Sequence, residues 1–155
     1  LELQKTASTQ KLRYMGQTPL FPGCYLRIRA RIKAISGNLP SVRIAGWAGT
    51  GSETHVTGLT EAGPSVTLTD YGQVVEVSAI VGSGNRGGVD MVWGNVPVYA
   101  HFGLDLTGPN GGVIRIDDIE IEDITNVFHR DLMNWVDVRD SGPVGEGVTD
   151  DSAAL

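Results

Sequence analysis

Hydrophobic and polar residues alternate most clearly in CYLRIRARIKAI, residues 24–35. Leu26, Ile28 and Ile32 fall on one side of an extended chain, while arginines and a lysine fall on the other side. Alternation with a period of two over this length predicts a β-strand with one buried face. After the turn sequence SGNLP, the same alternation resumes in SVRIAGW, residues 41–47.

Further strand-like stretches follow along the chain. They are SVTLT (65–69), QVVEVSAIV (73–81), VDMVWG (89–94), VPVYAHFGLDLTG (96–108) and VIRIDDIEIEDI (113–124). In residues 96–108 the pattern assigns Val98, Ala100, Phe102, Leu104 and Leu106 to the core face, and Tyr99, His101 and Asp105 to the opposite face. In residues 113–124 the alternation changes phase at Asp117 and Asp118, so we expect a β-bulge there that returns the following isoleucines to the core.

These seven or eight strands, separated by turns rich in glycine and proline, predict an all-β fold. We expect an antiparallel β-sandwich of the jelly-roll type over residues 1–125. Residues 126–134 form an expected connector with a possible short helix, and a new strand-like segment begins at Trp135. Residues 1–23, with scattered apolar positions and the breaker sequence TPLFPG, give no clear element.

The glycine-rich stretch VGSGNRGG matches a dinucleotide-binding fingerprint at Gly82, Gly84 and Gly87. That site requires a helix to begin at the third glycine, because the helix N-terminus holds the phosphates. Here another strand-like segment follows instead. We therefore expect a long hairpin or a loop between sheets.

Composition narrows the classes of function. The formal net charge of −6 argues against general nucleic-acid binding, which depends on lysine and arginine. No apolar run has the length of about 20 residues needed for a membrane helix, so we expect no membrane insertion. The single Cys24 cannot form an intramolecular disulfide. The chain begins at Leu1 rather than at methionine, so we expect an excised fragment or a processed protein.

Few residues of the chain indicate metal binding or catalysis. His55, His101 and His129 lie far apart in sequence without the spacing of transition-metal ligands, so we expect neither a metal site of this kind nor a cofactor. A structural calcium ion, held in part by Asp117 and Asp118 at the expected bulge, is an alternative that the sequence leaves open. No nucleophile motif is present, so we expect this fragment not to be an enzyme.

The positions opposite the core in residues 24–35 form a cationic row of about 20 Å. The row consists of Arg27, Arg29, Arg31 and Lys33. It could capture carboxylates of an acidic polysaccharide. Alternatively, Glu120 and Glu122 could neutralise it from a neighbouring strand, and this interpretation is favoured because first and last strands are often adjacent in such sandwiches.

The last 20 or so residues contain VRD, spaced glycines and the sequence GVTDD at residues 147–151. This pattern resembles the start of the pectate-lyase-like right-handed β-helix superfamily, which includes polysaccharide depolymerases and phage tailspikes. The sequence departs from the usual pattern at Ser141, Pro143, Val144 and Glu146. The resemblance implies that residues 135–155 begin a truncated β-helix domain, that the parent protein could carry polysaccharide-degrading activity, and that it could form a trimer.

Residues 14–125 resemble galactose-binding-like jelly rolls of the carbohydrate-binding-module type. PGCYLRIRARIKAISG, FGLDL and IRIDDIEIED carry this resemblance. It implies a sugar ligand, and aromatic side chains can cover the apolar face of a pyranose. The aromatic candidates are Trp47, Trp93, Tyr71 and Tyr99. Trp47 and Tyr99 are preferred because of their solvent-facing parity, with Arg43 and His101 on the same faces as hydrogen-bonding partners.

Two hypotheses of function follow. In the first, a non-catalytic module binds cell-surface or extracellular polysaccharide through Trp47, Tyr99, Arg43 and His101. In the second, a structural adaptor trimerises the β-helix protein or docks it onto a phage-like particle, with Phe128, Leu132, Met133 and Trp135 packing around a symmetry axis. Either hypothesis places the parent outside the cell, on a cell surface or on a virion.

Overall fold

A computed structural model of the chain describes residues 1–128. Leu1–Asp123 forms one compact unit. Of the second unit, the structure describes only the beginning, including the helical turn α1 (Thr125–Phe128). The predicted β-helix start at 135–155 and the connector residues Leu132, Met133 and Trp135 lie outside the described residues.

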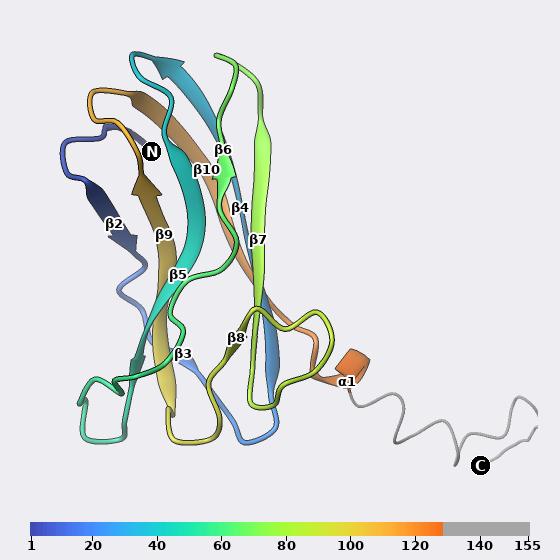
Figure 1. Ribbon diagram of the computed structural model, residues 1–155. Coiled ribbons are helices and arrows are strands. Elements are labelled where there is room, and N and C mark those ends of the chain that lie inside the picture. The colour runs from blue at the N-terminus through green and yellow to red at the C-terminus, as the bar shows by residue number, and fades with distance from the viewer. Residues whose placement is uncertain (129–155) are drawn as a thin grey trace, which may run out of the picture. The chain divides into compact units, whose positions relative to one another are not determined.

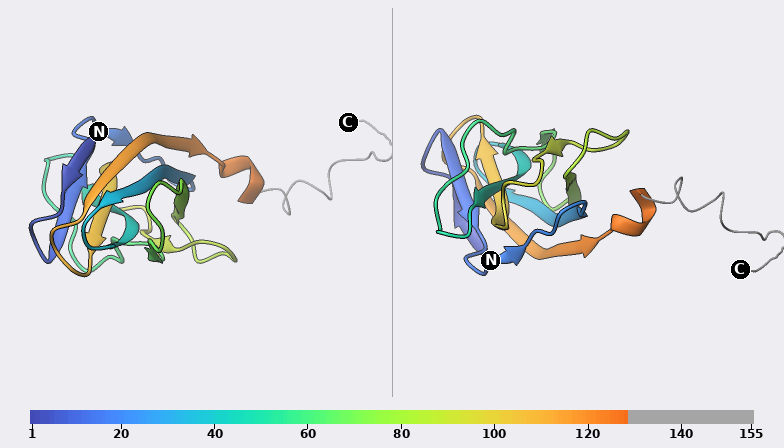
Figure 2. Two further views of the ribbon diagram at one scale, coloured as in Figure 1. Left: turned by 90° about the horizontal axis from the view of Figure 1, so that it is seen from above. Right: turned by 90° about the horizontal axis from the view of Figure 1, so that it is seen from below.

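The first unit is a β-sandwich of two facing sheets, as the alternation predicts (Figure 1). Viewed from above and from below, β4 and β10 lie in one layer and β5 and β9 in the other (Figure 2). The first sheet has the order β1 (Glu2–Gln4), β10 (Val113–Asp123), β4 (Tyr25–Ser36), β7 (Val75–Gly82) and β8 (Met91–Val92). The second has the order β2 (Thr9–Arg13), β9 (Tyr99–Thr107), β5 (Ser41–Gly49) and β6 (Val66–Thr67), with β3 (Thr18–Pro19) also paired to β9.

The core lies between the sheets and is built from the predicted alternating positions. Ile28 of β4, Ile44 of β5 and Phe102 of β9 are all fully buried. Burying each such side chain contributes about 1.5–3 kcal/mol relative to leaving it in water. Val98 is an exception, because it precedes β9 and is exposed rather than part of the core.

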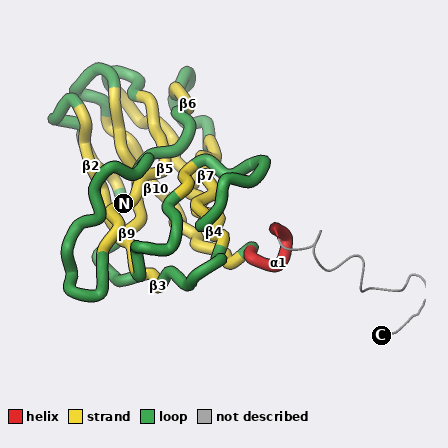
Figure 3. The backbone as a smooth tube through the Cα atoms, turned by 60° about the horizontal axis from the view of Figure 1, so that its bottom comes forward, coloured by secondary structure: helices red, strands yellow, loops and turns green. Residues whose placement is uncertain are grey.

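The N-terminal segment supplies three short strands that the sequence pattern does not predict. β1 pairs with β10, whereas β2 and β3 both pair with β9. Figure 3 shows β2 beside β9. These strands have only two to five residues, too few for an alternation to be recognised, and their pairing partners lie about 80 to 110 positions later in the chain.

A fully buried lysine ties this N-terminal segment to the turn between β9 and β10. The Lys5 ammonium group donates hydrogen bonds to the carbonyl oxygens of Ala7 (2.5 Å) and Gly108 (2.8 Å) and to Oδ1 of Asn110 (2.6 Å). Three oxygens thus match the three N–H donors of an ammonium group. A buried charge is tolerated only when it is solvated in this way by the protein.

The predicted bulge is present in β10. Asp118 has a φ angle of 40°, and the pairing with β4 shifts between Asp117 and Ile119. The shift returns Ile119 to the parity of the core, opposite Ala30. Ile119 nevertheless remains 39% exposed, so the expectation that all four isoleucines of this strand reach the core is wrong for this residue. Register determines which face a side chain occupies but not whether another element covers it.

The glycine-rich stretch forms a loop without a helix between β7 and β8. The two strands are parallel neighbours in one sheet, so the loop is neither the hairpin nor the inter-sheet connection that we expect from sequence. Asp90 closes the loop: its carboxylate accepts a hydrogen bond from the Ile80 N–H (2.8 Å), and its own N–H donates to the Ile80 carbonyl (2.9 Å). Gly88 has a φ angle of 92°, which glycine adopts readily, and a Cβ at Gly82 or Gly84 would collide with the Tyr25 side chain.

Candidate functional site

Three of the four members of the cationic row on β4 are neutralised by β10, which lies beside β4 in the sheet, whereas Lys33 lies opposite Arg115. The ion pairs are Arg27 with Glu122 (3.4 Å), Arg29 with Glu120 (2.9 Å) and Arg31 with Asp118 (3.5 Å). The favoured interpretation of this row is therefore confirmed. Because these arginines already face carboxylates, the outer face of the first sheet is not a free cationic surface for a polysaccharide.

The four predicted sugar-binding residues all come from β5 and β9, the paired strands of the second sheet. Trp47 lies directly opposite His101, and Arg43 lies opposite Asp105. Tyr99 lies opposite Gly49, two positions further along β5 from Trp47. The outer face of the second sheet therefore brings Trp47, Tyr99 and His101 together, as their parity predicts.

An aromatic row crosses this face, with the indole of Trp47 between two imidazoles. The His55 ring is stacked on Trp47, with centroids 5.2 Å apart and planes at 15°. The His101 ring approaches from the other neighbouring strand, with centroids 5.6 Å apart and planes at 34°. Rings from the loop and from β9 thus flank the indole, and the stacked His55 ring covers part of the surface on which a sugar could otherwise stack.

His55 reaches this row from the loop that follows β5. Its backbone forms an isolated bridge with Gly49, and the next N–H, that of Val56, donates to the Ala48 carbonyl (2.9 Å). The His55 Nε2 donates to the Glu61 carboxylate (2.6 Å). Contacts of the backbone and of the ring thus both hold His55 in place. Sequence analysis missed His55 and Glu61 as site residues, because loop residues carry no periodicity that assigns them a face.

Tyr99 is on the predicted face, but its ring is not exposed for a sugar to stack on. It is only 8% exposed. Its ring lies edge-on to His101, with centroids 5.6 Å apart and planes at 77°, and tilted against Trp47 at 5.9 Å. A Cβ on Gly49, the residue opposite, would collide with the Tyr99 ring, so the glycine makes room for it. The expectation of a solvent-exposed tyrosine is wrong, and this ring instead supports its neighbours.

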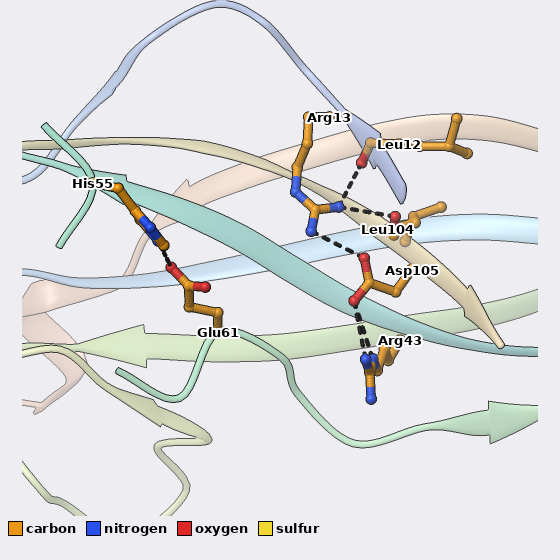
Figure 4. A network of polar contacts seen from close by, with 7 residues as sticks. All are labelled: Leu12, Arg13, Arg43, His55, Glu61, Leu104 and Asp105. Carbon is orange, nitrogen blue, oxygen red and sulfur yellow. Dashed lines mark hydrogen bonds and ion pairs between the residues drawn. The ribbon is translucent and has the colours of Figure 1, made fainter. Parts of the chain in front are cut away.

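Arg43 is held by a buried carboxylate that the sequence pattern places on the outer face. Asp105 accepts from Arg43 Nη2 (3.2 Å) and from Arg13 Nη2 (3.0 Å), and its side chain is 5% exposed (Figure 4). Arg13 also donates from Nη1 to the carbonyl oxygens of Leu12 and Leu104, each at 3.0 Å. Both guanidinium groups are therefore positioned before any ligand arrives. Arg13 escaped prediction because it lies in the N-terminal segment.

A hollow of about 300 Å³ opens on this face between the aromatic row and Arg13. A second hollow, of about 350 Å³, lies on the other side of Tyr99 and is lined by Gln17, Thr50 and Glu53 among others. The first hollow is lined by Lys11, Arg13, Trp47, His55, Glu61 and His101, together with Met15 and Gly46. Aromatic edges, cations and a carboxylate thus surround a space of the size that a small sugar occupies.

The other two aromatic candidates lie elsewhere. Trp93 belongs to the core: it is 3% exposed, stacks on Phe102 at 5.6 Å, and donates from Nε1 to the Thr60 carbonyl (2.7 Å). Its interpretation as a sugar-stacking residue is wrong. Tyr71 is exposed, but its hydroxyl donates to the Gly37 carbonyl and its backbone bridges to Ala34 of β4, on the other sheet.

Within residues 1–128, no three His, Cys, Asp or Glu side chains are grouped closely enough to hold a metal ion. His55 and His101 are brought near each other, which their spacing in sequence did not predict, but Trp47 lies between them. At the bulge, Asp118 faces Arg31. Burial raises the pKa of the Cys24 thiol, so this side chain is a poor nucleophile. In the same part of the chain, no helix has the length and hydrophobicity needed to span a bilayer.

No protein-family model matches the chain, and no curated protein matches it. Among solved structures, the chain is similar to the EclA C-terminal domain, described as a sugar-binding protein. That match has a TM-score of 0.51 and 14% identity, and it covers 79% of this chain and 76% of that one. The chain is also similar to the CBM22-1 xylan-binding domain of Xyn10C from Paenibacillus barcinonensis, with a TM-score of 0.47 and 10% identity over 68% of this chain and 58% of that one. The similarity to the EclA domain is one of fold.

Proposed function

We propose that the β-sandwich is a carbohydrate-binding module and that its ligand occupies the hollow beside Trp47. The observation that carries this proposal is the convergence of ring edges, cations and one carboxylate on a 300 Å³ space. Sugars need both kinds of contact, because their C–H groups are apolar and their hydroxyls donate and accept hydrogen bonds. The shared fold with a protein described as sugar-binding supports the same function.

The side chains around the hollow have hydrogen-bonding capacity left for sugar hydroxyls. His101 donates from Nδ1 to the Gly16 carbonyl (3.2 Å), so its Nε2 remains for a sugar hydroxyl. His55 donates from Nε2 to Glu61, which leaves its Nδ1 as an acceptor. Arg43, with two of its nitrogens on Asp105, keeps its Nη1 donors for a hydroxyl at the far end of this face.

The proposed ligand is a polysaccharide of a cell surface or of the extracellular space, and the module binds it without catalysis. The resemblance of residues 135–155 to a β-helix start supports a parent protein of the tailspike or polysaccharide-lyase kind. In such a parent, the sandwich would hold the polysaccharide close to the β-helix. Binding and any degradation would then belong to different parts of one protein.

Affinity electrophoresis of the 155-residue chain through gels that contain neutral or acidic polysaccharides tests this function. We expect retardation in at least one gel, reduced in the variants Trp47→Ala and His101→Ala. Tyr71→Ala is the matched control, because Tyr71 is an exposed aromatic residue associated with the other sheet. Circular dichroism verifies that each variant is folded. Equal retardation of the wild type and Trp47→Ala would contradict the proposed site.

A second function, that of an assembly adaptor that trimerises the parent or docks it onto a particle, is favoured by one observation. Phe21 and Val96 are each 67% exposed, on loops joined by a hydrogen bond from the Gly23 N–H to Oδ1 of Asn95 (3.3 Å). Exposed apolar groups gathered on neighbouring loops are typical of contact surfaces. Sedimentation at increasing concentration tests this function: self-association that Phe21→Ser abolishes would support it, and a strict monomer would count against assembly through these loops.

A further inference from the structure

We infer that the glycan bound beside Trp47 is acidic, and that Lys11 and Arg13 receive its negative group. This inference rests on the proposed function and specifies its class of ligand. It follows from an excess of positive charge beside the hollow: Lys11 and Arg13 line it, and a single buried carboxylate, Asp105, is shared by Arg13 and Arg43.

The strand register produces this excess. Along β9, Asp105 lies opposite Lys11 of β2 on one side and opposite Arg43 of β5 on the other. Arg13 lies one pair of residues closer to the aromatic row, opposite Gly103. Asp105 is the shared partner of both arginines, at 3.0 and 3.2 Å. One carboxylate cannot neutralise three cations, so the cluster retains a net positive charge.

Lys11 is the cation that has most freedom to bind a ligand. It is exposed and lines the hollow, and its ammonium group makes no hydrogen bond or ion pair with the residues that the structure describes. Arg13 complements it, because three contacts hold its guanidinium group in place while its Nε–H and one Nη2–H remain available. A guanidinium group held in place, together with a mobile ammonium group, suits a carboxylate, because a carboxylate accepts several charge-assisted hydrogen bonds.

The spacing fits a single sugar residue or two linked ones. Two residues along a strand advance about 6.6 Å, so Arg13 lies about 7 Å, and Lys11 about 13 Å, from the level of Trp47 and His101. A pyranose in contact with the ring edges therefore directs a substituent toward Arg13, and the next residue of the chain reaches Lys11. Gly103 keeps the strands close at this point, since a Cβ there would collide with the Leu12 carbonyl.

The charges elsewhere in the protein determine how an anionic ligand approaches this cluster. The three arginines of the basic row on the opposite sheet are already paired with acids, and the formal net charge of the chain is −6. A polyanion is therefore repelled by the molecule as a whole. Screening in physiological salt limits that repulsion to about 8 Å, so a local cationic cluster can still bind an anionic group held against it. Glu61, at the aromatic end of the hollow, orients the negative group toward Lys11.

The test compares carboxylated polysaccharides with the same polymers after chemical reduction of their carboxyl groups. The probes are polygalacturonate, alginate and hyaluronan, each native and carboxyl-reduced, with dextran sulfate to distinguish a sulfate ligand from a carboxylate. We expect at least one native polymer to bind about tenfold or more tightly than its reduced form, because a charge-assisted hydrogen bond contributes at least that much. Lys11→Gln should remove most of this difference, whereas the control Lys33→Gln, on the other sheet, should preserve it.

The outcomes separate this inference from the proposed function. If native and reduced polymers bind equally and Trp47→Ala still abolishes binding, the acidic ligand is wrong and the sugar site stands. If only dextran sulfate binds, and Lys11→Gln weakens it, the ligand is anionic but sulfated. If none of these polymers binds, both the inference and the proposed sugar site are contradicted for this class of ligand.

Discussion

Trp47 and His55 lie face to face, with ring centroids 5.2 Å apart and an interplanar angle of 15°. One ring stands on a strand and the other on a loop that turns back beside that strand. The histidine occupies the side of the indole that would otherwise be open to a pyranose. The loop is therefore part of the candidate site, and its contact with Trp47 determines which surface of the indole a ligand can reach.

Replacing His55 tests the energy of this contact. We expect His55→Ala to lower the free energy of unfolding by about 0.5–1.5 kcal/mol, because a stacked pair contributes that much beyond area burial. His55→Phe should retain most of the stability, since it keeps the stacking and loses only the hydrogen bond to Glu61. Urea denaturation followed by circular dichroism measures both. Equal destabilisation by the two variants would mean that the Glu61 contact, not the stacking, holds the loop.

Removing the carboxylate shared by two arginines should be far more costly. Asp105→Asn leaves Arg13 and Arg43 without the group that balances their charge, in a place where the aspartate side chain is 5% exposed. Breaking a buried ion pair from one side typically costs about 3–5 kcal/mol, and we expect the lower end because Arg43 is partly exposed. The control is Glu122→Gln, whose ion pair with Arg27 is exposed and should contribute less than about 1 kcal/mol. A similar midpoint of urea denaturation for both variants would contradict a special role of Asp105.

The sequence predicts those parts of the fold in which one face of a long strand is buried. Ile28 and Ile44 are such positions, and their strands have nearly the predicted bounds because alternation directly reflects a two-sided environment. Short edge strands lack this signal. β2, for example, is defined by its hydrogen bonds to β9, whose residues lie about 90 positions later. Local sequence contains no information on a partner at that distance.

For the candidate site, the alternation of residues predicts which face of the sheet a side chain lies on, but not whether neighbouring side chains cover it. It correctly places Tyr99 with Trp47 and His101, yet Tyr99 is buried by the rings around it. Arg43 is on the predicted face as well, but Asp105 already engages it. His55 and Glu61 come from a loop, where the position of a side chain depends on contacts with β5 rather than on its spacing in sequence.

The buried Lys5 provides a test of the N-terminal segment. In Lys5→Met, a side chain of similar length replaces the ammonium group and leaves the oxygens of Ala7, Gly108 and Asn110 without their donor. These oxygens belong to exposed residues, so water can reach part of them once the ammonium group is gone, and we expect a loss of about 1–3 kcal/mol. Urea denaturation measures the loss, and Lys33→Met, at a partly exposed position of β4, is the control. If Lys5→Met were as stable as the control, the three hydrogen bonds would contribute little.

The Cys24 thiol should make the stability of the protein depend on alkaline pH. Burial raises the pKa of this thiol above its ordinary value of about 8.5, and the charge of Asp123 adds to the effect. The folded state therefore holds the thiol proton to a higher pH than the unfolded state does. This contribution to stability is complete below the pKa of the unfolded thiol and is lost as the pH rises through the folded value. Denaturation midpoints between about pH 7.5 and 10 should fall more steeply for the wild type than for Cys24→Ser.

The folded protein should also react more slowly with iodoacetamide at pH 8 than the urea-unfolded chain does, because the thiolate is the reactive form. Equal alkylation rates in the two states would contradict the raised pKa.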